Sequence, residues 1–186
     1  KDTGVLVWSS TPGITPKDSS FAPLTFEDLP NGRRVFYSGT GCGHIVCIDV
    51  RTGQALWRFQ MSYGGVNAGV VIHNDSIIAV HGKENIDSTI IGRMVAIKKP
   101  KSLPGLGEDI LVLGKDHEIW RNSGIEAFTS TPVYRDGRVY STIKRGELVC
   151  LDSATGEEHW VLKLAPDQIH ASPTWADGRL YVPCLL

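Results

Sequence analysis

The sequence predicts an all-β protein assembled from copies of one four-stranded antiparallel unit. Two observations predict this: one segment recurs without a gap, and short β-rich runs alternate with turn signals along the whole chain. No segment combines helical periodicity with helix caps. A repeat at this spacing governs the fold, because each copy buries its apolar face against its neighbour.

The recurring segment runs from Gly43 to Trp57 and again from Gly146 to Trp160. Gly, Val, Cys, Asp, Thr, Gly and Trp occupy matched positions in the two copies. In each copy a β-rich run ends at Asp, a Thr-Gly turn follows, and a second run ends at Trp. Asp can accept hydrogen bonds from the turn backbone, and Gly tolerates the positive φ that such a turn requires. We therefore expect a β-hairpin in each copy.

Two weaker copies flank these hairpins. Residues 2–8 keep the turn and the closing Trp8, and residues 92–98 keep the strand. The closing tryptophan of the second weak copy is Trp120, which follows an insertion at 100–107 that is rich in Pro and Gly. We expect this insertion to be a surface loop, which a repeat tolerates at small entropic cost.

A second signature precedes each hairpin. Residues 131–140 match residues 172–181, and in both an Asp-Gly pair separates two β-rich runs, which is a strong hairpin signal. Each repeat is thus predicted to have four strands, the last ending at Trp. The chain, treated as a single domain of residues 1–186, divides into the last strand of a preceding unit, three whole units and the start of another: 1–8, 18–57, 65–120, 127–160 and 168–186.

These motifs resemble the pyrroloquinoline-quinone-like (PQQ-like) propeller repeat, whose pattern is Ala-x-Asp-x-x-Thr-Gly-x-x-x-Trp. The pattern stands here at Cys47–Trp57 and Cys150–Trp160, with Cys in place of Ala. The resemblance implies a β-propeller of four-stranded antiparallel blades, with about three to four blades present as part of a seven- or eight-bladed ring. A four-bladed ring completed by residues 1–8 is the alternative. The resemblance also implies that the closing tryptophans dock between blades: Trp8, Trp57, Trp120 and Trp160.

A candidate ligand site follows from the alignment of the blades. In propellers the first strand of each blade lines a central channel, and the loops that enter these strands form one mouth. The alignment assigns Ser20, Asn67, Thr129 and His170 to one equivalent position, with Glu126 and Asp167 just ahead of it. Converging polar groups there would suit a small ligand, and the carboxylates with Asn67 could supply oxygen ligands to Ca²⁺. The alternative is that these side chains only face water.

Composition narrows the function classes. The formal net charge is -1 and basic residues are scattered among acids, which argues against nucleic acid as a partner. No apolar run reaches the roughly 18 residues that a membrane helix needs. There is no GxSxG elbow, HExxH or P-loop, and neither the cysteines nor the histidines show zinc-ligand spacing. We therefore expect no catalytic residue and no metal site.

The sequence thus favours a non-catalytic scaffold or binding module, with a protein partner or small ligand at one propeller face and no cofactor. By resemblance we expect it in the bacterial cell envelope, periplasmic or secreted. The alternative is part of a pyrroloquinoline quinone- and calcium-dependent alcohol or sugar dehydrogenase. Such enzymes often cover the quinone with a disulfide of adjacent cysteines, which this sequence lacks, and Trp175 lies beside a turn. An insertion that opens at His81 is a second place where a partner could bind.

Overall fold

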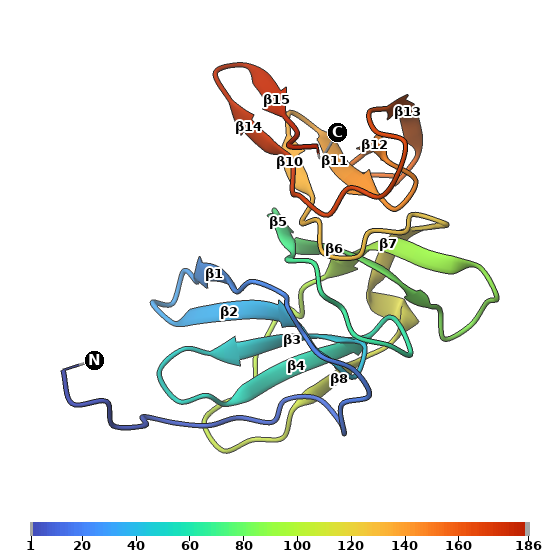
Figure 1. The fold of residues 1–186 in the computed structure, drawn as a ribbon. Coiled ribbons are helices and arrows are strands. Elements are labelled where there is room, and N and C mark those ends of the chain that lie inside the picture. The colour runs from blue at the N-terminus through green and yellow to red at the C-terminus, as the bar shows by residue number, and fades with distance from the viewer. Residues whose placement is uncertain (1, 185–186) are drawn as a thin grey trace.

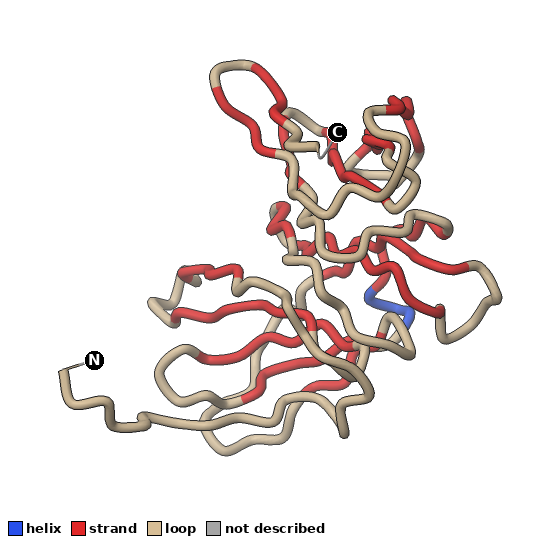
Figure 2. Tube along the Cα trace, viewed as in Figure 1, coloured by secondary structure: helices blue, strands red, loops and turns tan. Residues whose placement is uncertain are grey.

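The computed structural model describes residues 2–184, and Figures 1 and 2 show these as strands joined by loops with one short helical segment. Blade 1 contains β1 (Thr25–Asp28), β2 (Arg34–Gly39), β3 (His44–Asp49), β4 (Ala55–Gln60) and β8 (Leu111–Leu113). Blade 2 contains β5 (Val71–His73), β6 (Ser76–Glu84), β7 (Ile91–Lys98) and β9 (Glu118–Ser123), with the 3₁₀ segment η1 (Lys115–His117) before β9. Blade 3 contains β10 (Val133–Arg135), β11 (Arg138–Ile143), β12 (Glu147–Asp152) and β13 (Glu158–Lys163). Blade 4 contains β14 (Thr174–Ala176) and β15 (Arg179–Tyr181).

The predicted all-β fold of four-stranded antiparallel blades is confirmed. In blades 1, 2 and 3 four strands follow one another as an antiparallel meander. The blades are arranged as a fan in which the first strands face one another, and β10 contacts both β5 and β14 (Figure 1). The inner strands are therefore the first strands of the blades.

The outer hairpins of blades 1, 2 and 3 have the same strand register at the closing tryptophan. The closing tryptophans Trp57, Trp120 and Trp160 lie opposite Cys47, Ala96 and Cys150, and each pairing is followed by a register shift on the facing strand. This geometry places a small residue, Cys or Ala, opposite each closing tryptophan. A bulge at the same place in blades 1, 2 and 3 adds twist to each of these outer hairpins.

The predicted turns form as the sequence indicates. Asp49 Oδ1 accepts hydrogen bonds from the backbone nitrogens of Arg51 and Thr52, each at 2.9 Å, and Gly53 follows at φ +73°. Asp152 repeats this arrangement in blade 3. At the Asp-Gly hairpins both central residues have positive φ, for example Asp136 at 49° and Gly137 at 76°, as a type I′ turn requires.

The insertion in blade 2 departs from the sequence-based expectation. Residues 100–107 are a loop, but the chain then forms β8, which pairs in parallel with β4 of blade 1 before it returns to blade 2 as β9. The loop is held on blade 1, because Arg33 donates a hydrogen bond to the Pro104 carbonyl at 2.8 Å and Gln54 to the Gly105 carbonyl at 2.8 Å. Blade 1 thus gains a fifth strand that the sequence did not reveal.

The apolar core lies between successive blades. One cluster joins blades 1 and 2 through residues such as Trp57 and Ile77, and a second joins blades 2 and 3 through residues such as Val80 and Val149. Each blade is therefore stabilised by its neighbours rather than by a core of its own.

The four closing tryptophans have different surroundings. Trp8 donates a hydrogen bond to the Val50 carbonyl at 3.0 Å, and Trp120 donates one to the Ser153 carbonyl at 2.9 Å. In both cases the ring lies against the glycine of the next blade's Thr-Gly turn. Trp57 is only 1% exposed and lies opposite Leu111 in the β4–β8 pair, whereas Trp160 is 37% exposed.

Candidate functional site

Ser20 and Asn67, two of the residues predicted at a channel mouth, lie between blades 1 and 2. The Ser20 hydroxyl donates a hydrogen bond to the Gly39 carbonyl at 2.9 Å. Asn67 is 2% exposed, and its side-chain oxygen accepts a hydrogen bond from the Phe21 backbone nitrogen at 3.2 Å. Both side chains are therefore engaged in contacts within the fold.

Polar residues at equivalent places link blade 2 to blade 3 and blade 3 to blade 4. Thr131 accepts a hydrogen bond from the Gly69 nitrogen at 2.8 Å, and its own nitrogen donates to Ser172 at 2.9 Å. Thr129 donates to the His170 carbonyl at 3.0 Å. The repeated polar position at the start of each blade thus connects neighbouring blades.

The two predicted carboxylates do not converge on one point. Glu126 forms an ion pair with Lys144 at 3.2 Å, and Asp167 accepts a hydrogen bond from the backbone nitrogen of Gln168 at 2.7 Å. Among residues 2–184 no group of three or more His, Cys, Asp or Glu side chains is arranged to hold a metal ion. These carboxylates therefore do not supply the converging oxygen ligands that Ca²⁺ requires.

A small cavity of about 130 Å³ lies where blades 2, 3 and 4 approach each other. Lys83, which lines this cavity, contacts two other residues: its ammonium group is 2.8 Å from the Asp18 carboxylate and 5.4 Å from the centre of the Phe128 ring. The Lys83 hydrogen bond is the main reason that the pKa of Asp18 lies below its usual value. His170 packs edge-on against Phe128 with ring centres 5.8 Å apart. We define the entry-side cluster as these residues: Lys83, Glu126, Phe128, Lys144, Gln168 and His170.

The predicted site is thus divided. The entry-side cluster includes Glu126 and His170, with Thr129 bonded to His170, whereas Ser20 and Asn67 form a separate group. Within the described part of the chain no hydrogen bond joins the two groups. Sequence reasoning missed Phe128, which directly precedes the aligned position of Thr129 and could have been found there. It assigned Lys83 to the insertion at His81 and not to this site.

The residues that could hold a quinone do not fit one. Trp175 stacks on Tyr140 of blade 3 with ring centres 6.3 Å apart, and the Arg135 guanidinium lies over Trp175 at 5.8 Å. Trp175 therefore contacts residues of blade 3. Among residues 2–184, Trp175 and the carboxylates of Glu126 and Asp167 are thus each engaged in contacts within the fold.

The predicted insertion between the middle strands of blade 2 does not open at His81, because β6 continues to Glu84 and the loop to β7 spans residues 85–90. His81 lies in β6 and is fully buried, so it cannot contact a partner. Its side-chain Nδ1 accepts a hydrogen bond from the Lys83 nitrogen at 3.1 Å. Burial, together with the nearby Arg93 guanidinium, lowers the pKa of His81 to about 4. The histidine is therefore a neutral core residue at pH 7.

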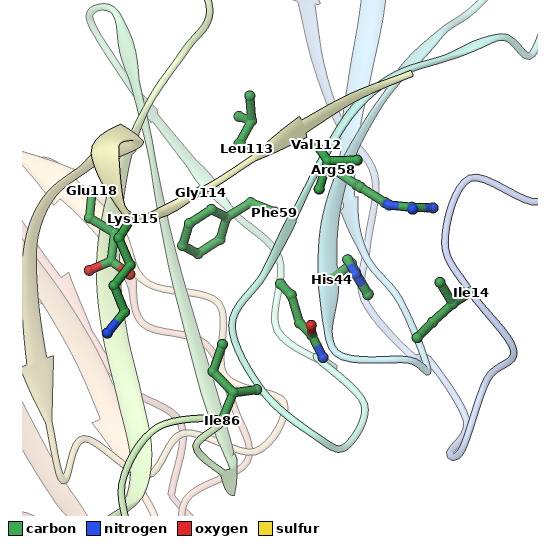
Figure 3. A pocket seen from close by; sticks show the side chains of 11 residues that line it. Ile14, His44, Arg58, Phe59, Ile86, Val112, Leu113, Gly114, Lys115 and Glu118 are labelled. Carbon is green, nitrogen blue, oxygen red and sulfur yellow. The ribbon is translucent and has the colours of Figure 1, made fainter. Parts of the chain in front are cut away.

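A larger cavity of about 370 Å³, which the sequence did not predict, lies at the outer strands of blades 1 and 2 (Figure 3). Its lining is mostly apolar, with charged groups at its margins: Ile14, His44, Arg58, Phe59, Gln60, Ile86, Val112, Leu113, Gly114, Lys115 and Glu118. Burial lowers the pKa of His44, which keeps its ring neutral at pH 7. We call this cavity the outer groove.

Comparison with known proteins agrees with this fold. The family model described as outer membrane protein assembly factor BamB matches residues 109–183. BamB from Moraxella catarrhalis aligns with a TM-score of 0.60 at 21% identity, covering 87% of this chain and 42% of that chain. The computationally designed protein Ika4 aligns with a TM-score of 0.60 at 14% identity, covering 95% of this chain and 90% of that chain. The chain thus spans less than half the length of the BamB structure. No curated protein matches it significantly.

The described residues contain no helix with the length and apolar character needed to cross a membrane. The structural likenesses, at identities of 21% and 14%, concern the fold. The family-model match lies over blade 3, blade 4 and the strands that precede them.

Proposed function

We propose that this chain, which matches a PQQ-like propeller family model over residues 109–183, is a non-catalytic binding module of the bacterial cell envelope. In this proposal it acts in the periplasm or outside the cell and holds a protein partner at the entry-side cluster. The likeness to an outer membrane protein assembly factor carries the proposal. It uses no quinone and no calcium.

The chemistry of the entry-side cluster supports a protein partner. The aromatic ring of Phe128 lies between the Lys83 ammonium and the His170 ring, and all three residues are at least partly exposed. Aromatic side chains next to polar groups are typical of the contact regions of protein interfaces. Ser20, Asn67, Thr129 and Asp167 act in this proposal as neighbours that hold the inner strands in position.

Quinone binding tests the non-catalytic part of the proposal. The protein is mixed with pyrroloquinoline quinone and Ca²⁺ and then desalted, and the retained quinone is measured by its absorbance. We expect no retention, because Trp175 is engaged by Tyr140 and Arg135 and the carboxylates of Glu126 and Asp167 do not converge. Stoichiometric retention that a chelator abolishes would overturn the proposal in favour of a dehydrogenase.

Site-directed photo-crosslinking tests the partner. The chain carries benzoylphenylalanine in place of Phe128 and is exported to the periplasm of a Gram-negative bacterium. Phe26, which is exposed on β1 of blade 1, receives the same group in the control. We expect a discrete protein adduct from position 128 that unlabelled chain suppresses, and none from position 26. The same adduct from both positions would contradict a partner site at the cluster.

A further inference from the structure

Among residues 2–184, no strand pairs with the second edge of β8, the fifth strand of blade 1, and we call this its free edge. β8 is the last strand in the order of its sheet and pairs with β4 on one side. Its middle residue, Val112, is 67% exposed. An edge strand offers unpaired backbone N–H and C=O groups, which are a template for an additional extended segment.

The outer groove adjoins β8 and its partner strand β4. Val112 and Leu113 of β8 form one wall, Phe59 of β4 lies in the middle, and Ile86 lies across from them (Figure 3). A volume of about 370 Å³ is at the lower end of the range for sites that take a small ligand or an anchoring side chain. The groove therefore has room for an apolar side chain carried by a segment that pairs with β8.

The charges around the groove are unequally compensated. Lys115 is 3.0 Å from the Asp87 carboxylate, and both carboxylate oxygens of Glu118 accept hydrogen bonds from Arg121. Arg58 differs, because its guanidinium has a hydrogen bond to the Gly13 carbonyl at 3.2 Å and no carboxylate within 4.0 Å among residues 2–184.

Neighbouring groups do not compensate the Arg58 charge. Val112 faces Arg58 across the β4–β8 pair, Val46 faces it across the β3–β4 pair, and His44 in the same groove is neutral at pH 7. An apolar groove with one uncompensated guanidinium is complementary to an apolar group followed by a carboxylate. Guanidinium–carboxylate hydrogen bonds are among the stronger polar contacts in proteins.

We propose that the free edge of β8 and the outer groove bind an extended peptide segment of a partner protein, with an apolar side chain in the groove and an adjacent Asp or Glu on Arg58. The inference rests on the binding-module function proposed above and adds a second contact surface, on the outer strands. It identifies Arg58 as the residue that selects acidic segments.

Peptide titration tests this site. The probe is an acetylated and amidated peptide of sequence Thr-Val-Thr-Leu-Asp-Val-Thr, and its partner has Asn in place of Asp. Binding to the ¹³C-methyl-labelled chain is followed by NMR through the methyl signals of Ile14, Ile86 and Val112. We expect saturable shifts at these methyls and about tenfold tighter binding of the Asp peptide, as one charge-assisted hydrogen bond predicts.

Two variants and a modified peptide separate charge, backbone pairing and folding. Arg58→Gln should remove the preference for the Asp peptide, and Arg58→Lys should restore part of it. Arg51→Gln is the matched control, because Arg51 is exposed at the β3–β4 turn, away from the groove. Two further peptides carry N-methyl groups on alternate backbone nitrogens, one peptide for each edge. The peptide that is methylated on the edge facing β8 should not bind, whereas the other should still bind.

The possible results have distinct meanings. Equal binding of the Asp and Asn peptides, or full binding of both N-methylated peptides, overturns the proposed site. Shifts confined to the methyl groups of Ala127 and Thr129, which flank Phe128, also overturn it, while they support a partner site at the entry-side cluster. Retention of quinone and Ca²⁺, in contrast, overturns the proposed function and leaves the peptide result to be judged by itself.

Discussion

Replacement of Gly156 by alanine tests the contact between blades 2 and 3. A Cβ atom at this position would lie 2.3 Å from Cε3 of Trp120, so the ring would have to move by more than 1 Å to reach an ordinary contact distance. Gly156 also has φ +73°, which disfavours any residue with a Cβ atom. The substitution thus combines backbone strain with displacement of a tryptophan that is 8% exposed.

The structure provides a way to separate these two costs. Gly137 has φ +76° and nothing within 4 Å of the place that a Cβ atom would occupy, so Gly137→Ala measures the backbone term alone. That term is about 1–2 kcal/mol. Overpacking against a ring held on several sides adds about 1–3 kcal/mol. We therefore expect Gly156→Ala to reduce the free energy of unfolding by about 2–5 kcal/mol, clearly more than Gly137→Ala.

Urea unfolding followed by far-UV circular dichroism measures both losses, because the midpoint and slope give the free energy of unfolding of each variant. Gly53→Ala, at which the added atom would meet Trp8 at 2.5 Å, should resemble Gly156→Ala. If Gly156→Ala and Gly137→Ala cost the same within about 0.5 kcal/mol, the assignment of Trp120 to a packed contact on Gly156 is refuted.

Three other perturbations have defined outcomes. Trp57→Ala should cost about 3–5 kcal/mol in unfolding experiments, and Trp160→Ala clearly less, because the Trp160 ring is partly exposed. The folded chain should lose stability as the pH falls from 6.5 to 4, because in this range His81 takes up a proton in the unfolded chain but not in the folded chain, where its pKa is about 4. His81→Gln should make this loss of stability smaller. Asp87→Asn should cost about 3–5 kcal/mol, because it leaves the buried Arg93 guanidinium without its carboxylate at 2.6 Å.

Matched variants control these measurements. His73→Gln alters a half-buried histidine on β5 and should leave the acid slope of urea midpoints unchanged if His81 causes it. Asp28→Asn breaks an exposed ion pair with Arg34 and should leave the urea midpoint almost unchanged, because solvent screens such pairs. Equal losses for Asp28→Asn and Asp87→Asn would contradict the distinction between exposed and buried ion pairs.

The blade architecture could be predicted because its determinants are local. The Asp and Gly of each Thr-Gly turn, and the Asp136-Gly137 pair, fix backbone angles within a few residues, and the structure has those angles. The spacing from Cys47 to Trp57 also fixed the register of the outer hairpins. Local patterns of this kind can be recognised in a single sequence.

The fifth strand and the site could not be predicted in the same way. β8 has three residues, and it forms because Leu111 and Leu113 meet Trp57 and Phe59, which are remote in sequence. The aligned polar position was recognised, but the sequence does not reveal that Asn67 bonds Phe21 of the preceding blade. Whether a polar side chain serves a ligand or a neighbouring blade depends on tertiary distances.

The path of the chain through β8 has a consequence for how the protein unfolds. Between the third and fourth strands of blade 2 the chain crosses to blade 1, pairs with β4 and returns. Blades in a repeat protein are usually coupled by surface contact alone, so that each can open with a free energy set by its nearest neighbours. Here blade 2 cannot lose its outer strand without straining the edge of blade 1, and these two blades form one cooperative unit. Amide hydrogens of β4 and β9 should then exchange with solvent together, at a rate separate from those of blade 3.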